Sequence, residues 1–203
     1  MDIKDKTGLH IEGHIKIWSP DTNEIFVNKR NAIHYEHMSI ALANSISNSG
    51  NGFIHKMAFG NGGTAVDPTG IITYLPTNTV GQNVSLYNPT YSKIIDNTAI
   101  ANPDPANNKM TITHVPGTVY TDILVSCLLD YGEPPEQQAF DNSTNFNGEY
   151  VFDELGLKAW NGSTTDLRLI THVIFHPVQK SLNRQIQIDY TLRIQTLSNI
   201  NAV

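Results

Sequence analysis

The stretch from Asn31 to Thr64 reads NAIHYEHMSIALANSISNSGNGFIHKMAFGNGGT, and it predicts one helix, a turn, one buried strand and a glycine-rich exit. Apolar residues in its first half recur at three- to five-residue steps, which places them along one side of a helix over about 34–48. Asn31 is the expected N-cap, and Gly50 is the expected left-handed residue after the helix. Such a short helix is marginal alone in water, so its apolar side must pack on the rest of the fold.

The segment FIHKMAF at 53–59 carries apolar side chains on both faces of an extended chain, as expected of a strand that is covered on both sides. Elsewhere polar and apolar residues alternate, as in 10–18 and 184–194, which is typical of strands with one face in the core. Asn161 and Gly162 give the strongest hairpin-turn signal. We therefore expect a mainly β fold, an antiparallel β-sandwich with one short α-helix and long irregular loops, as a single domain over residues 1–203.

The composition favours many strands joined by many loops. Only 16% of the residues are charged and 39% are hydrophobic, and the balance is rich in Asn, Thr, Ser, Gly and Pro, the residues of turns and strand edges. The formal net charge is −6 and no run of Lys or Arg forms a basic stripe, so nucleic acid is not an expected partner.

Cys127 is the only cysteine, which excludes an internal disulfide bond. It lies in the apolar run ILVSCLL at 123–129 and is expected to be a small core residue rather than a nucleophile. No window approaches ~18 uninterrupted apolar residues, so we expect no membrane span. Residues 1–6 lack the apolar region of a secretory signal, and the absence of disulfides fits synthesis in a reducing cytoplasm.

Two motifs resemble functional sites but lack the partners that the chemistry needs. Residues 60–65 (GNGGTA) loosely match G-x-G-x-x-A, yet no helix follows whose N-terminus would meet a phosphate. These glycines are interpreted as a tight turn that needs positive φ. Glu149, Asp153 and Glu154 could be glycosidase carboxylates, but no second carboxylate stands at a matching spacing, and we expect them on the solvent face of a strand.

The histidines of the strands are too far apart to share one metal ion. His10 and His14 lie four residues apart on one strand face, a span of ~13 Å at ~3.3 Å per residue. The same spacing separates His172 and His176. Metal–nitrogen bonds of about 2 Å cannot bridge that distance.

His34 and His37 lie three residues apart in the predicted helix, which is not the H-E-x-x-H spacing of zinc proteases. Tyr87, Tyr91 and Trp160 could form a platform for a sugar, but aromatic residues beside turns more often pack locally. No nucleophile motif is present. We therefore expect a non-enzymatic chain with no catalytic residues, no cofactor and no bound metal.

Two long segments of weak periodicity, at about 63–108 and 131–148, are expected to project from the domain as loop arms. Such loops gain their order against neighbouring chains, where many weak contacts add up. We expect the subunit interface at aromatic and aliphatic residues on these arms, namely Tyr87, Tyr91, Ile94, Ile95 and Phe140.

Residues 13–67, about a quarter of the chain, resemble a recurring pattern in virion proteins of tailed bacteriophages. The pattern has a Gly-His strand start (13–14), a D-T-x-E turn (21–24), an N-A-I entry into a short helix (31–33) and an x-x-G-x-G-T exit (60–64), which here has one extra glycine. The resemblance implies a non-enzymatic building block of the neck, collar, tail or head surface. It carries no binding residues across.

Together, the residues and the resemblance lead us to expect a structural subunit of a tailed-phage virion, in a neck, collar or tail-associated position. It would be made in the bacterial host cytoplasm and would assemble into a ring-like homo-oligomer through the loop arms. Its partners would be copies of itself and other virion proteins. Two alternatives remain: a carbohydrate-binding, host-attachment or capsid-decoration module, and a metal-assisted hydrolase that uses histidines.

Overall fold

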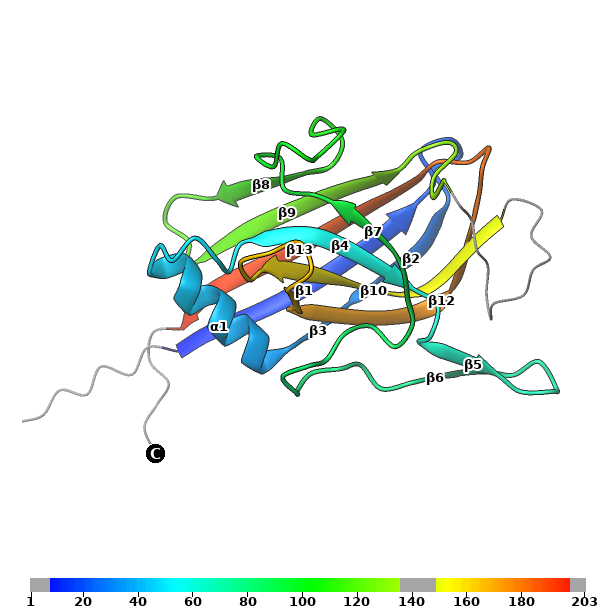
Figure 1. Cartoon of the computed structure of the whole chain (residues 1–203), viewed down its shortest axis with the longest axis horizontal. Helices are drawn as coiled ribbons and strands as arrows, with labels where there is room; N and C mark the ends of the chain where they lie inside the picture. The colour runs from blue at the N-terminus through cyan, green and yellow to red at the C-terminus, as the bar shows by residue number, and fades with distance from the viewer. Residues whose placement is uncertain (1–7, 136–148, 198–203) are drawn as a thin grey trace, which may run out of the picture.

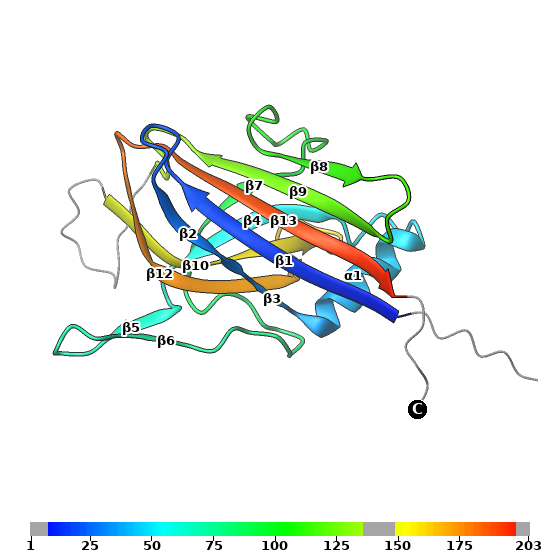
Figure 2. The same ribbon diagram turned by 180° about the vertical axis from the view of Figure 1, so that it is seen from behind.

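The computed structural model describes residues 8–135 and 149–197, and in this part of the chain two antiparallel β-sheets face each other (Figure 1, Figure 2). The first sheet has the strand order β2-β1-β13-β9-β8. Its strands are β1 (Gly8–Trp18), β2 (Ile25–Arg30), β8 (Lys109–His114), β9 (Tyr120–Leu129) and β13 (Ile186–Leu197). The predicted mainly β sandwich with one short helix is confirmed.

The second sheet has the order β3-β12-β10-β4-β7, and β11 pairs with β10 off this path. Its strands are β3 (Ala32–Ile33), β4 (Ile54–Gly60), β7 (Pro89–Ile94), β10 (Glu149–Trp160), β11 (Leu167–Leu169) and β12 (Thr171–Ser181). A separate hairpin consists of β5 (Thr64–Val66) and β6 (Ile72–Tyr74). It extends from the body at the end away from the helix (Figure 1).

An apolar layer lies between the two sheets because long strands alternate inward and outward residues. β1 and β13 pair along their whole length, from Gly8 opposite Leu197 to Trp18 opposite Gln187. The buried set that faces inward comes from both sheets and includes Ile15, Ile17, Met57, Phe59, Phe152, Leu155, Ile188 and Tyr190. Cys127 belongs to this core, and burial raises the pKa of its thiol to about 12. The prediction of a core cysteine is confirmed.

The helix α1 (Tyr35–Ile46) lies across one open end of the sandwich (Figure 2). The predicted N-cap is wrong: His34 caps the helix, and its Nδ1 accepts the backbone N–H of His37 at 3.2 Å. Asn31 instead donates from its side chain to the Tyr190 hydroxyl. The left-handed residue directly after the C-cap Ser47 is Asn48, with φ +53°, and Gly50, predicted for that place, is left-handed two residues later, with φ +76°. Within the described residues, no helix is long and apolar enough to cross a membrane.

The predicted loop arm over 63–108 is wrong for most of its length. Residues 76–88 fold back over the outer face of the second sheet, where Leu86 packs with Ala58 and Leu169. β7 then pairs with β4 and extends the sheet. The physical reason is that apolar side chains on the outer face of this sheet need a cover. Within the described residues, β5 and β6 project at one end of the body, and the loop between β7 and β8 extends beyond β8 (Figure 1). The rest of the second arm, 136–148, lies outside the described residues.

Replacing a residue between the sheets should destabilise the fold far more than replacing an apolar residue at its rim. Ile188 is fully buried, whereas Ile112 on β8 is 73% exposed. We expect Ile188→Ala to lower the free energy of unfolding by about 2–5 kcal/mol, because the removed methyl groups leave a cavity. Ile112→Ala should change it by less than about 0.5 kcal/mol. Urea unfolding followed by circular dichroism measures both, and equal losses would contradict this core.

Candidate functional site

Two adjacent carboxylates, Asp153 and Glu154, are both fully buried in β10, although strand alternation would expose one of them. The pairing of β10 with β12 is irregular between Phe152 and Glu154. Phe152 faces the core before this irregularity, and Leu155 faces it afterwards. The prediction that these two carboxylates lie on the solvent face is therefore wrong. The side chain of Glu149 lies outside the described part of the chain.

The Glu154 carboxylate joins three segments of the chain. Its Oε1 accepts the backbone N–H groups of Asn88, at 2.8 Å, and Gly62, at 3.2 Å. Its Oε2 accepts the backbone N–H of Tyr87 and the Nε2–H of His172, each at 3.0 Å. Two donors on each oxygen fill the acceptor positions of the carboxylate.

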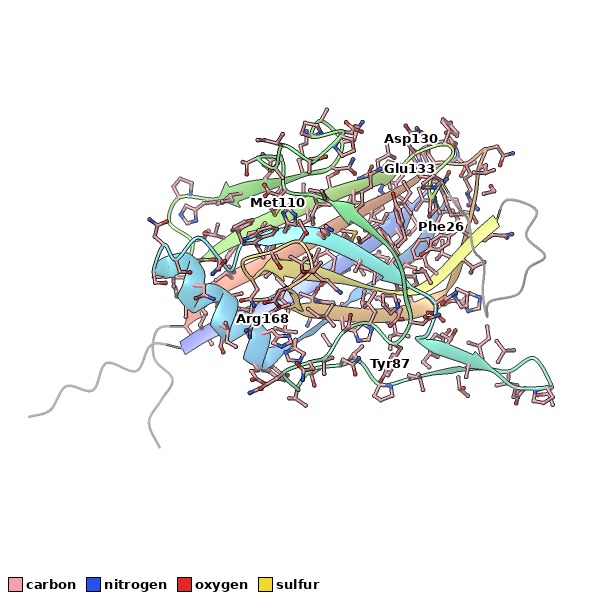
Figure 3. All side chains as sticks on the ribbon, in the orientation of Figure 1. Phe26, Tyr87, Met110, Asp130, Glu133 and Arg168 are labelled. Atoms are coloured by element: carbon pink, nitrogen blue, oxygen red, sulfur yellow. The ribbon has the colours of Figure 1, made fainter. Side chains whose placement is uncertain are left out.

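His172 links Glu154 to the segment that covers the outer face of the sheet. The Nδ1 of His172 accepts the backbone N–H of Asn78 at 2.8 Å, so the hydrogen of the ring lies on Nε2 and points at Glu154. The ring of Tyr87 lies 5.8 Å from the imidazole, centroid to centroid. Its hydroxyl donates to the carbonyl oxygen of Pro76 at 2.7 Å. Figure 3 shows Tyr87 beside the segment that leads out of the hairpin after β6.

Asp153 holds the base of the β5–β6 hairpin. Its carboxylate accepts the backbone N–H of Gly63 at 2.9 Å and that of Thr64 at 2.8 Å. The Thr64 hydroxyl donates to the same carboxylate. Across the base, the backbone N–H of Leu75 donates to the carbonyl oxygen of Gly63 at 2.9 Å. The hairpin therefore leaves the body at a fixed position.

The two carboxylates differ in how folding changes their pKa. Burial opposes ionisation of Glu154, but hydrogen bonds from His172, Asn88 and Tyr87 outweigh it, and the pKa is lowered from its ordinary value of 4.5. For Asp153, burial outweighs the hydrogen bonds from Thr64 and Gly63, and the pKa is raised. Ionised Glu154 therefore stabilises the fold above pH 4.5, whereas ionisation of Asp153 opposes folding.

The glycines of the GNGGT segment provide space rather than an unusual backbone angle. Gly60, Gly62 and Gly63 are not among the residues with positive φ, so the predicted need for positive φ is wrong. A Cβ on Gly62 would lie 2.7 Å from the Asn88 nitrogen, and one on Gly63 would lie 2.9 Å from Ile174 Cγ2. Only glycine lets the backbone come close enough to donate to the two carboxylates.

This cluster acts chemically as a clamp. Its oxygens point at backbone donors, and both carboxylates are fully buried. Hydrogen bonds between ionised groups and backbone N–H groups are about twice as strong as neutral ones. We call residues 76–88, which lie over the outer face of the second sheet, the cover segment. The arrangement thus fixes the cover segment, the exit from β4 and the hairpin base against β10 and β12.

The histidines are spread over the fold. Within residues 8–135 and 149–197, no group of three or more His, Cys, Asp or Glu side chains lies close enough to hold a metal ion. His34 and His37 stack at 3.9 Å between ring centroids, and the ring nitrogens of His37 lie 2.8 Å and 3.0 Å from the carbonyl oxygens of Leu169 and Gln82. These contacts tie α1 to the second sheet and its cover segment.

The five predicted interface residues do not form one surface. Ile95 is fully buried in the core, so its assignment to an interface is wrong. Ile94 is half-buried, and Tyr91 packs against the core, where burial raises its pKa to about 12. Tyr87 is exposed and stands at the foot of the hairpin. Phe140 lies outside the described residues.

Tyr87, Tyr91 and Trp160 do not form a common platform, and each ring packs locally, as expected. Trp160 stacks on Phe53 with 6.0 Å between ring centroids, and Tyr91 lies 6.0 Å from Phe59. Tyr87 lies on the other face of the second sheet, beside His172.

The β5–β6 hairpin exposes apolar side chains on both of its faces. Val66 is 62% exposed and Ile71 61%, and Tyr74 and Leu75 are also exposed. The sequence signal is the turn DPTG at 67–70, between two short β-type segments. The hairpin lies within 63–108, the segment that we expect to project, and it is a part of that segment that extends from the body.

An apolar groove of about 690 Å³ lies at the helix end of the sandwich. It is lined by residues of α1, of the start of β4 and of β8, β9 and β13, among them Met38, Leu42, Phe53, Met110, Ile112 and Ile194. Figure 3 shows Met110 at this end, on the other side of the molecule from Tyr87. None of the side chains that line the groove is charged.

No protein-family model matches the chain, and no curated protein or solved structure is significantly similar to it.

Replacing Glu154 by Gln should destabilise the fold by about 3 kcal/mol, because the amide NH₂ would face backbone N–H groups that then lack an acceptor. Glu24→Gln, at an exposed carboxylate, is the matched control and should cost less than about 0.5 kcal/mol. The stability difference between wild type and Glu154→Gln should be full at pH 7 and shrink as the pH falls below 4.5. Urea unfolding at several pH values tests this; a difference that grows on acidification would contradict the clamp.

Proposed function

We propose that this chain is a structural subunit of a tailed-phage virion and that it self-assembles through the β5–β6 hairpin. The observation that carries this proposal is an ordered, projecting hairpin with uncovered apolar side chains. A two-stranded hairpin is at best marginally stable in water. One whose apolar residues face solvent on both sides gains stability when a neighbouring chain covers it.

Hydrogen bonds at its tip and at its base hold the hairpin in one conformation. At its tip, the Asp67 carboxylate accepts the backbone N–H groups of Thr69, at 2.8 Å, and Ile71, at 2.9 Å, and the Thr69 hydroxyl at 2.6 Å. These hydrogen bonds lower the pKa of Asp67. At its base, Asp153 holds Gly63. A loop fixed at both ends loses little conformational entropy on binding, which favours its use as an interface.

The fold supports a role in assembly rather than in catalysis. The buried carboxylates accept hydrogen bonds from backbone donors, and residues 13–67 resemble a pattern of virion building blocks. The position proposed is in the neck, collar or tail of the particle, with copies of the same chain and other virion proteins as neighbours.

The double substitution Val66→Ser/Ile71→Ser should abolish self-assembly and leave the fold intact, because both side chains are exposed. Analytical ultracentrifugation should show an oligomer for wild type and a monomer for the variant. Ile100→Ser/Leu182→Ser removes exposed apolar groups elsewhere and should keep the wild-type mass. A wild-type chain that stays monomeric at high concentration would overturn the proposal of self-assembly.

The virion assignment has its own test. Antibodies against the purified chain should label intact particles of the phage that encodes it, at the neck or tail, in electron micrographs. Purified particles that lack the chain by mass spectrometry would contradict this assignment, whatever the oligomeric state of the isolated protein.

A further inference from the structure

We propose that the β5–β6 hairpin of one copy docks in the apolar groove of the next copy, beside α1 and β8. This inference rests on the proposed self-assembly and names the two surfaces that meet. The groove holds about 690 Å³ and is lined mainly by aliphatic and aromatic side chains. That size is typical of sites that enclose several side chains or a small ligand.

The groove exists because the inner face of the first sheet is not fully covered at the helix end. Ile112 pairs with Ile123 on β8 and β9, and both line the groove, yet Ile112 is 73% exposed. The helix reaches the groove with Met38, Ala41, Leu42 and Ser45 and leaves Ile112 open. In residues 8–135 and 149–197, no segment covers the exposed apolar part of this inner face.

Charges fit this occupant. The hairpin between Thr64 and Leu75 has one charged residue, Asp67, whose carboxylate is already bound by its own turn. The groove lining has no charged side chain. Docking the hairpin therefore buries no unpaired charge, although the whole chain carries a net charge of −6.

The strand edges also match. β8 is the last strand of its sheet and pairs only with β9 in the described chain. β5 and β6 pair only with each other there. Each therefore has an edge of backbone groups that is not paired with another strand, although on β8 the N–H of Met110 donates to Asn97 Oδ1 at 3.4 Å. A hairpin that enters the groove can add a strand to β8 from Thr111 onward and pair the remaining groups.

The hairpin and α1 lie at different ends of one chain (Figure 1, Figure 2), and the groove is lined in part by α1. A hairpin cannot reach the groove of its own chain. Contact between two different surfaces of identical copies is heterologous, and it produces a ring where the rotation closes. The geometry thus fits the ring-like assembly proposed above.

A cysteine pair tests this contact directly. The native Cys127 is fully buried and its thiol pKa is raised to about 12, so it gives little background reaction. Ala65→Cys places an exposed thiol on the hairpin, and Thr111→Cys places one on the exposed edge strand at the groove. We expect a covalent two-chain product when the two full-length variants are mixed and cross-linked with a short bismaleimide, and loss of that product when the hairpin also carries Val66→Ser/Ile71→Ser.

The controls separate this contact from self-assembly in general. Leu182→Cys, exposed elsewhere, should give no product with Thr111→Cys. Ile112→Glu should leave the fold intact and abolish both the oligomer and the product, because it places a charge in the groove. An intact oligomer without the Ala65→Cys/Thr111→Cys product overturns the docking proposal and leaves self-assembly standing. A product of Ala65→Cys with itself would also overturn it, since hairpins would then meet each other.

Discussion

The fully buried carboxylate of Glu154 is the point at which the second sheet, its cover segment and the exit from β4 are held together. It lies where the pairing of β10 with β12 is irregular, and its four hydrogen bonds come from residues far apart in the sequence. Removing a carboxylate from water is costly unless its acceptor positions are filled, and here they are. Its four donors lie in three segments of the chain, at 62, 87–88 and 172.

The buried carboxylates also hold the base of the exposed β5–β6 hairpin. Asp153, the neighbour of Glu154, binds the first residues of the hairpin, and the hairpin then extends away from the body with Val66 and Ile71 in solvent. At the other end, the inner face of β8 and β9 is left open beside α1. A head-to-tail assembly needs two different surfaces on the same chain. Here these are a projecting hairpin and an open apolar groove.

Much of the fold can be predicted from the sequence, because the spacing of apolar residues along the chain differs between helices and strands. The helix, the buried strand at 53–59 and the alternating strand at 184–194 all follow from spacing alone. β7 does not, because its sequence PTYSKI shows no strong alternation and the strand is defined by its pairing with β4. Ile95 follows β7, and its backbone N–H donates to the carbonyl oxygen of His55 beside β4. This pairing places Ile95 in the core, so its predicted place in an interface is wrong.

The candidate site is harder to predict, because it depends on contacts between distant residues. Asp153 and Glu154 look like surface residues of a strand until the irregular pairing with β12 buries both. The glycines at 60–63 look like a turn, but they serve the close approach of the backbone to these carboxylates. The sequence predicts projection for all of 63–108, but it does not show that 76–88 and β7 pack on the second sheet while the hairpin extends from the body.

Hydrogen–deuterium exchange measured at low and high protein concentration tests the central claim most directly. The account predicts that backbone amides of the hairpin, 64–75, and of β8, 109–114, become more protected as the concentration rises, while those of 60–63 and 87–88 are protected at both. Exchange in the hairpin and in β8 that does not change between a dilute monomer and a concentrated sample would contradict it.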